Sequence, residues 1–201
     1  MIAPSRLLRG LRYTCIMIRM RALLNAVFAA LLLAVPLPAP PAAAQTAEEL
    51  LSQLADPELE RWQRVERQLI SEWSKSGSPA MDLLLQRGRN ALQAGQVEAA
   101  LEHLTALTDH APDFAEGWNA RAAAWYQSGQ YGPALADIAQ TLTLNQQHFG
   151  ALIGLGMILE ETGRETRALE VFRAARTIHP HQPIIQRAIA RLEARVSGRD
   201  T

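Results

Sequence analysis

Cysteine is nearly absent from this 201-residue sequence, because Cys15 is the only one. Cys15 lies upstream of an apolar run and not beside a cleavage site, so it is a poor candidate for lipid attachment. Beyond residue 44 the sequence has no cysteine at all. That part of the chain can therefore form no disulfide, no thiolate nucleophile and no cysteine-ligated metal site.

Acidic residues are missing from the first forty-four positions, whose only charges are five arginines ahead of the apolar run ALLNAVFAALLLAV at 22–35. This order, closed by Ala42 and Ala44, is typical of a secretory signal peptide cleaved after Ala44. The run is shorter than the roughly twenty residues that a membrane-spanning helix needs. We therefore expect 1–44 to be removed, leaving no stable membrane insertion. An uncleaved membrane anchor remains the alternative, and translation starts at Met1 or Met20.

Lysine is also scarce, with Lys75 alone against nineteen arginines. That bias indicates a GC-rich bacterial genome, so we expect the exported protein to lie in the periplasm. Removal of the five N-terminal arginines leaves fifteen basic and twenty acidic residues, a formal net charge of −5. This charge argues against nucleic acid as a partner.

Motifs of catalysis are absent: the sequence has no GxSxG, Walker, Rossmann or HExxH pattern. The acidic pairs Glu48–Glu49 and Glu160–Glu161 do not converge on a substrate, because adjacent helical residues point in different directions. His179 and His181 fall short of the three or four ligands that a metal site needs, and we interpret them as solvated turn residues. We expect no enzyme, no cofactor and no metal. A role as a non-catalytic accessory of a cell-envelope enzyme remains an alternative.

Three similar segments, QAGQVEAALEHL (93–104), QSGQYGPALADI (127–138) and ETGRETRALEVF (161–172), recur at an interval of thirty-four residues. Repetition at such a period indicates stacked supersecondary units. Small residues keep fixed places in the copies: Gly88, Gly95 and Ala100; Ala122, Gly129 and Ala134; Gly156, Gly163 and Ala168.

Each copy is predicted to form two helices. In the second copy Trp118, Ala122 and Trp125 recur at i, i+4 and i+7, on one face of a helix. Gly129 then ends that helix, because glycine adopts the left-handed conformation without steric cost. Ala134 lies on the second helix, where a small side chain lets the two helices approach closely. We assign the tryptophans to the core.

These spacings resemble the tetratricopeptide repeat (TPR) family. The resemblance implies an all-α, right-handed superhelical solenoid whose region 79–182 holds three helix–turn–helix repeats, at 81–114, 115–148 and 149–182. Arg87 and Arg121 depart from the family pattern, which has leucine at those positions.

Two flanking segments complete the predicted solenoid. The 45–78 segment contains a capping box in TAEE (46–49) and a helix expected over 57–75, started by Asp56-Pro57 and packed on the first repeat. At the other end, 183–197 is expected to form the capping helix that shields the last repeat.

The resemblance also implies that the first helices of the repeats line a concave groove that binds a protein partner. The groove residues with suitable side chains are Leu85, Arg89, Leu92, Asn119, Tyr126, Ile153, Met157 and Glu160. Only Arg89 and Asn119 suit the carboxylate clamp of one subset of the family. The apolar strip of Leu85, Leu92, Ile153 and Met157, edged by Arg89 and Glu160, favours an amphipathic or extended apolar segment, in keeping with an adaptor or assembly factor. Alternatively, the flanking helices fill the groove.

Overall fold

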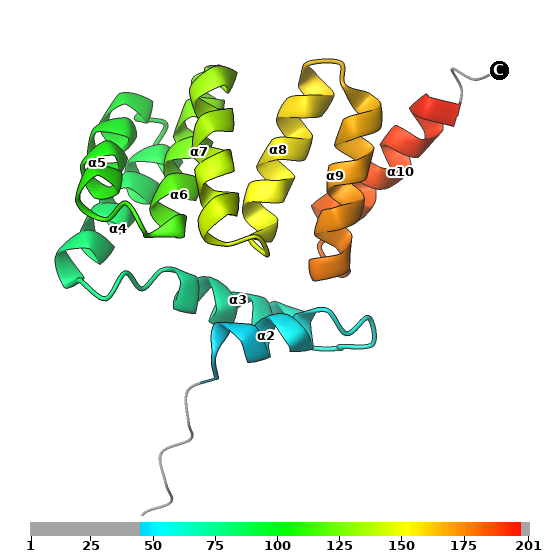
Figure 1. Cartoon of the computed structure of the whole chain (residues 1–201), viewed down its shortest axis with the longest axis horizontal. Helices are drawn as coiled ribbons and strands as arrows, with labels where there is room; N and C mark the ends of the chain where they lie inside the picture. Colours follow the sequence, from blue (N-terminus) through cyan, green and yellow to red (C-terminus); the bar gives the residue numbers. More distant parts are fainter. Residues whose placement is uncertain (1–44, 198–201) are drawn as a thin grey trace, which may run out of the picture. The chain divides into compact units, whose positions relative to one another are not determined.

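The computed structural model describes residues 45–197, which form nine helices and no strand (Figure 1). The predicted signal peptide, with Cys15 and the cleavage site after Ala44, lies outside the described residues. The helices are α2 (Ala47–Leu54), α3 (Trp62–Trp73), α4 (Pro79–Gln93), α5 (Val97–His110), α6 (Ala115–Gln127), α7 (Tyr131–Leu144), α8 (Phe149–Glu161), α9 (Glu165–Ile178) and α10 (Pro183–Ser197).

The helices α4 to α9 form three consecutive antiparallel pairs, and α10 packs on the last of them (Figure 1). The all-α solenoid of helix pairs predicted from the sequence is therefore confirmed. The buried side chains of α10, Ile185, Ala188, Ile189 and Leu192, join the core of the third pair around Phe172. The outward side of α10 carries polar residues, as an end cap requires.

The turn within each pair is built on a glycine. Gly95, Gly129 and Gly163 have φ angles of +73°, +74° and +74°. In the second pair the N–H of Gln130 donates to the carbonyl of Trp125 at 2.9 Å. This is the 6→1 hydrogen bond that defines a Schellman turn. Only glycine adopts this left-handed conformation without strain, so the three glycines fix the three turns.

The other small residues lie where the two helices of a pair touch. A Cβ at Gly88 would stand 2.5 Å from Leu104, and one at Gly156 would stand 2.7 Å from the Phe172 ring. Ala134 of the second pair is fully buried. The two helices of each pair can therefore approach closely because these positions carry no side chain or only a methyl group.

The N-terminal segment forms a hairpin of α2 and α3, starting at the predicted capping box. The Glu49 N–H donates to Thr46 Oγ1 at 3.2 Å, and the Thr46 N–H donates to Glu49 Oε2 at 3.0 Å. The predicted start of the second helix was wrong, since α3 begins at Trp62 and not at Pro57. Asp56 Oδ1 instead accepts the Glu58 N–H at 3.0 Å, forming a turn that reverses the chain between the two helices.

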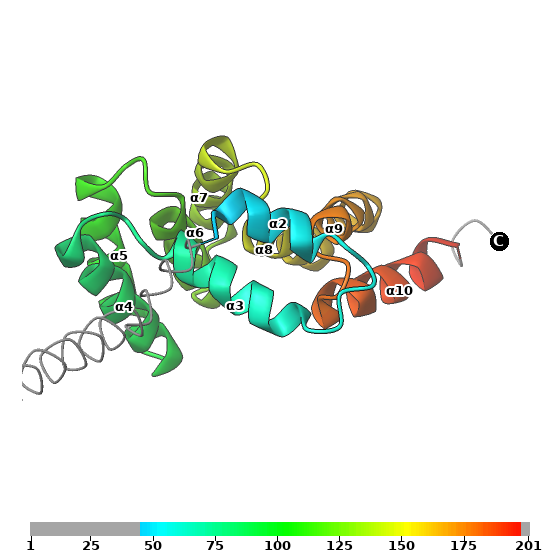
Figure 2. The same cartoon turned by 90° about the horizontal axis from the view of Figure 1, so that it is seen from below.

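The hairpin lies along the turns between repeats, as the two views show (Figures 1 and 2). The Trp62 ring packs against His179 at 5.4 Å between centroids, and the Trp73 ring stacks on His148 at 4.6 Å. The prediction that this helix packs on the first repeat was therefore wrong. Its apolar stripe instead finds apolar partners near the third pair, where Phe149 and Ile178 join the hairpin core.

His179 is fully buried, contrary to the expectation that it is solvated. Its ring lies between those of Trp62 and Phe149, and its Nε2 is 3.3 Å from Glu66 Oε1. Burial and the neighbouring His181 lower the pKa of His179 to about 4. Burial raises the pKa of Glu66. Because α3 packs over this turn, the imidazole of His179 is shielded from water.

Candidate functional site

The first helices of the second and third pairs, α6 and α8, enclose a largely apolar cavity of about 180 Å³. We name it the α6–α8 cavity. Its lining includes Asn119, Ala122, Ala123, Tyr126, Ile138, Gly150, Ala151, Ile153, Gly154, Met157 and Ile158.

Small residues account for this hollow. Gly150 and Gly154 lie one helical turn apart on α8 and present no side chain, while Ala123 of α6 presents one methyl group. Behind them, Ile138 of α7 closes the cavity, with its Cδ1 3.4 Å from the position of a Cβ on Gly154. The cavity is therefore built by residues that fail to fill the space between two helices.

A second cavity, of about 560 Å³, lies between α8 and α10, and we name it the α8–α10 cavity. Met157 lines both cavities, so the two are neighbours along the same groove. Around the second cavity stand Met157, Glu160, Glu161, Phe172, Ile184, Arg187, Ala188, Arg191 and Arg195.

The arginines of α10 recur every four residues and so share one face of that helix. Arg191 binds Glu160 through two hydrogen bonds, from Nε at 2.8 Å and from Nη2 at 2.7 Å. Arg195 adds a third from Nη1 at 3.1 Å. The hydrogen bonds from Arg191 hold the pKa of Glu160 below its usual value. Glu160 is therefore an ionised, well-partnered carboxylate.

The structure divides the predicted groove residues among the two cavities, the core of the first pair and a polar cluster on Glu116. Asn119, Tyr126, Ile153 and Met157 line the α6–α8 cavity, and Glu160 lines the α8–α10 cavity. Ile153 also packs against the core that the N-terminal hairpin shares with Phe149, so that hairpin covers part of the groove.

The prediction for Leu85 was wrong. Its side chain is only 2% exposed and packs with Leu104 and Leu107 in the core of the first pair. Leu92 is half-buried against the same core. Neither leucine lines either of the two cavities.

Arg89 and Asn119, the two candidates for a carboxylate clamp, both bind a carboxylate of the protein itself. Arg89 donates to Glu116 from Nη2 and to Ser74 Oγ at 2.9 Å from Nη1. Asn119 Nδ2 donates to the same glutamate at 3.2 Å. Glu116 was missed as an organising residue, because nothing in the local sequence shows that its carboxylate meets an arginine 27 residues away.

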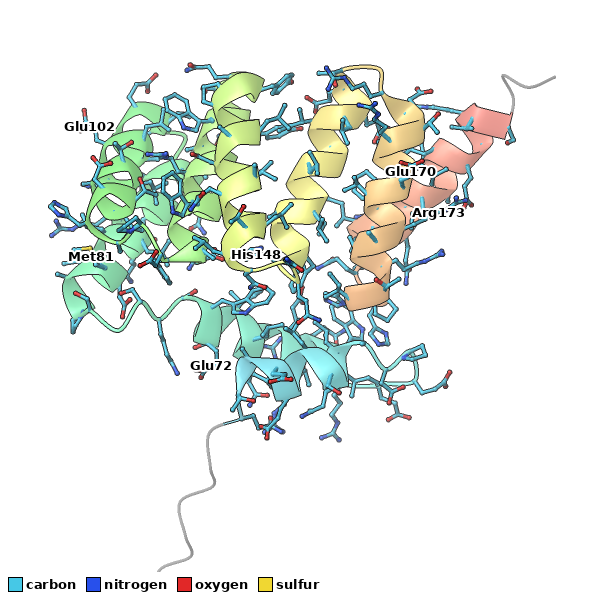
Figure 3. All side chains as sticks on the ribbon, in the orientation of Figure 1. Glu72, Met81, Glu102, His148, Glu170 and Arg173 are labelled. Atoms are coloured by element: carbon cyan, nitrogen blue, oxygen red, sulfur yellow. The ribbon has the colours of Figure 1, made fainter. Side chains whose placement is uncertain are left out.

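His148 completes this polar cluster at the turn between α7 and α8 (Figure 3). Its Nδ1 accepts the Ala151 N–H at 3.1 Å, so in the neutral ring Nε2 carries the proton and donates to Glu116 at 2.7 Å. Burial opposes ionisation of Glu116, but the hydrogen bonds that it accepts from His148 and Asn119 and the charge of Arg89 outweigh it. The pKa of Glu116 is lowered as a result.

Within residues 45–197 no three histidine, cysteine, aspartate or glutamate side chains gather as metal ligands would. None of the helices described for these residues combines the length and apolar character needed to cross a membrane.

Comparison with known proteins agrees with this architecture. A tetratricopeptide repeat family model matches residues 85–140 and again 126–183. A TPR repeat-containing protein of Rhizobium etli is 31% identical over 160 residues, which cover 78% of each chain.

Solved structures share the fold at lower identity. The TPR domain of Arabidopsis OM64 superposes with a TM-score of 0.56 at 22% identity, covering 58% of this chain and 96% of that domain. The first TPR domain of Spaghetti (RPAP3), solved with the HSP90 peptide SRMEEVD, gives 0.57 at 16% identity, covering 60% and 95%. The repeat geometry, the family model and the Rhizobium relative together show that this chain belongs to the tetratricopeptide repeat family, whose fold serves as a scaffold for protein–protein interaction.

Proposed function

We propose that this protein is an exported, non-catalytic adaptor or assembly factor that holds an apolar or amphipathic segment of a protein partner in its groove. The α6–α8 cavity carries this proposal. It is apolar, it opens between first helices of neighbouring repeats, and its lining contains only one amide and one phenol among the polar side chains, Asn119 and Tyr126. Such a site binds by excluding water from an apolar side chain.

The chemistry of the lining suits an inserted aliphatic or aromatic side chain. Met157 is unbranched and adapts its shape to a guest, and the Asn119 amide can orient a backbone group. The peptide held by the RPAP3 domain supports a peptide ligand for this fold. No cofactor, metal or nucleic acid enters the proposal.

We place this activity in the periplasm, reached through the signal peptide predicted at 1–44. The formal charge of −5 expected after cleavage supports a protein partner over a nucleic acid.

The groove can be tested by filling it. Ala123 is an exposed alanine of α6 that lines the α6–α8 cavity, whereas Ala139 is an exposed alanine of α7 that lines neither cavity. Ala123→Trp should fill the cavity, and Ala139→Trp adds the same ring elsewhere. The purified protein is used to select peptides from a displayed random library, and the selected peptides are titrated against both variants by fluorescence anisotropy.

We expect binding of the selected peptides to fall at least tenfold with Ala123→Trp and to be unchanged with Ala139→Trp. Equal binding by both variants, with unchanged circular dichroism, would place the peptide site on another surface and overturn the proposal.

A further inference from the structure

The α8–α10 cavity is lined by three arginines and two glutamates, and Glu165 beside it lies 3.6 Å from Arg195. Its two carboxylates are already partnered: Glu160 receives three hydrogen bonds from Arg191 and Arg195, and Glu161 accepts one from each of Tyr126 and Tyr131. Arg191 and Arg195 neutralise the charge of Glu160, and two tyrosine hydroxyls donate hydrogen bonds to Glu161. Neither carboxylate is therefore paired with the remaining arginine of the cavity.

That remaining cation is Arg187. Its side chain is exposed, it lines the α8–α10 cavity, and within residues 45–197 it has neither a hydrogen bond nor an ion pair. It stands one helical turn before Arg191 on the same face of α10. Beside it, Ile184 is 36% exposed, so an apolar rim flanks the free guanidinium. The surface thus offers a cation next to apolar area.

We propose that this cavity binds an acidic side chain, aspartate or glutamate, of the same partner segment whose apolar side chain enters the α6–α8 cavity. The inference rests on the proposed function and adds the chemistry of the partner. Met157 lines both cavities, so one segment can cross it with an apolar residue on one side and an acidic residue on the other. The guanidinium of Arg187 presents several donors in the planar arrangement that suits a carboxylate.

Glu160 sets how strongly the cavity attracts an acid. Its carboxylate occupies Arg191 and Arg195, which are about half exposed and would otherwise face the same space as Arg187. Arg195 also lies 3.6 Å from Glu165, so removing the charge of Glu160 should release chiefly Arg191 toward the partner. Removing Arg187 should have the opposite effect. Damage to the fold would weaken binding in both variants. Opposite changes in affinity would instead show that the charge of the cavity attracts the acidic side chain.

The test uses the purified protein and three displayed peptide libraries with identical apolar positions. Their flanking positions are restricted to Asp and Glu, to Asn and Gln, or to Lys and Arg. Selected peptides are then synthesised with blocked ends, so that no terminal carboxylate is present, and each acidic peptide is paired with its amide counterpart. Affinity is measured for Arg187→Gln, Glu160→Gln and the control Arg167→Gln, an exposed arginine of α9 that lines neither cavity.

The acidic library should be enriched, and acidic peptides should bind roughly tenfold more tightly than their amide counterparts. Arg187→Gln should remove most of that preference, Glu160→Gln should increase it by a few-fold, and Arg167→Gln should leave it unchanged. Amide peptides should bind all variants equally.

Three outcomes overturn the proposal, and they can be told apart. Equal enrichment of the neutral library, with binding still blocked by Ala123→Trp, refutes the acidic partner and keeps the apolar groove. No enrichment of any library refutes the groove and the acidic site together. Equal effects of Arg187→Gln and Arg167→Gln would show that only the overall charge matters, which also refutes a site at Arg187.

Discussion

Arg121 and Asp137 form an ion pair between the two helices of the second repeat, with Nε 2.7 Å from Oδ2 and Nη2 2.8 Å from Oδ1. Nη1 of the same arginine donates to Thr108 at 2.7 Å, and its guanidinium lies 4.8 Å from the Trp118 ring. The side chains of Arg121 and Asp137 are only 15% and 5% exposed. A partnered charge thus occupies the place where the family pattern has leucine.

Breaking this pair on one side should be costly. Asp137→Ala leaves the guanidinium buried without its partner, and we expect the free energy of unfolding to fall by about 3 kcal/mol. Replacing both residues by leucine removes the buried charges together and should cost less than the sum of the single changes. Urea unfolding of the double-mutant cycle measures this coupling. Strictly additive losses would show that the pair does not act as a unit.

Gly156→Ala should destabilise the third repeat. The added methyl would stand 2.7 Å from the Phe172 ring, so a packed side chain has to move, at a cost of about 1–3 kcal/mol. The matched control is Gly132→Ala in α7, where no residue beyond the chain neighbours lies within 4 Å of the new Cβ. There the better helix propensity of alanine is offset by Pro133, whose ring disfavours a Cβ on the helical residue before it, so we expect a smaller change than at Gly156. Thermal unfolding compares the two variants, and a loss at Gly132 equal to or larger than that at Gly156 would contradict this packing.

The buried His179 should make the protein less stable as the pH falls from 6.5 toward 4. In this window the unfolded chain binds a proton on the imidazole, whereas the folded protein does not, because the pKa in the fold is about 4. The linked loss is at most about 3 kcal/mol. Glu66, whose pKa is raised, contributes the opposite slope, so the comparison of variants isolates the histidine.

His179→Leu should remove that part of the pH dependence of urea unfolding. His110→Gln, a change at an exposed histidine, should keep it. If the two variants give the same slope as the unchanged protein, the pKa of His179 is the same in the folded and unfolded states and the assigned burial is wrong.

Trp73→Ala should loosen the N-terminal hairpin without unfolding the repeats. The ring stacks on His148 and contacts Phe149 at 5.4 Å, so its loss removes the main contact at the C-terminal end of α3. Hydrogen exchange followed by mass spectrometry should show faster exchange in α2 and α3, with α6 to α9 still protected. Gln68→Ala, at an exposed position of α3, is the control. Faster exchange throughout the solenoid would show that the hairpin is part of one cooperative unit.

Processing should yield a protein that starts near Gln45, because 1–44 has the composition of a signal peptide. Intact-mass measurement on protein recovered from the periplasmic fraction of producing cells checks this. Retention of Met1 or Met20 in a membrane fraction would instead support the anchored form.

The local features of the fold could be predicted from the sequence because each depends on a residue's own geometry. Gly95, Gly129 and Gly163 adopt the positive φ that the turns require, and Gly156 allows the close approach of Phe172. Thr46 forms its cap with a residue three positions away. The glycine requirements also repeat with the thirty-four-residue period, and therefore they are visible in the sequence.

The groove was decided by contacts between residues far apart in the chain. Arg89 meets Glu116 across 27 residues, and Arg191 meets Glu160 across 31. Sequence alone predicted Asn119, Ile153 and Met157 along the groove, but it could not show that Arg89 is already partnered or that the arginines of α10 face the same space. The energy of a charge depends on its neighbours and its access to water, and only the packing of helices against one another determines both.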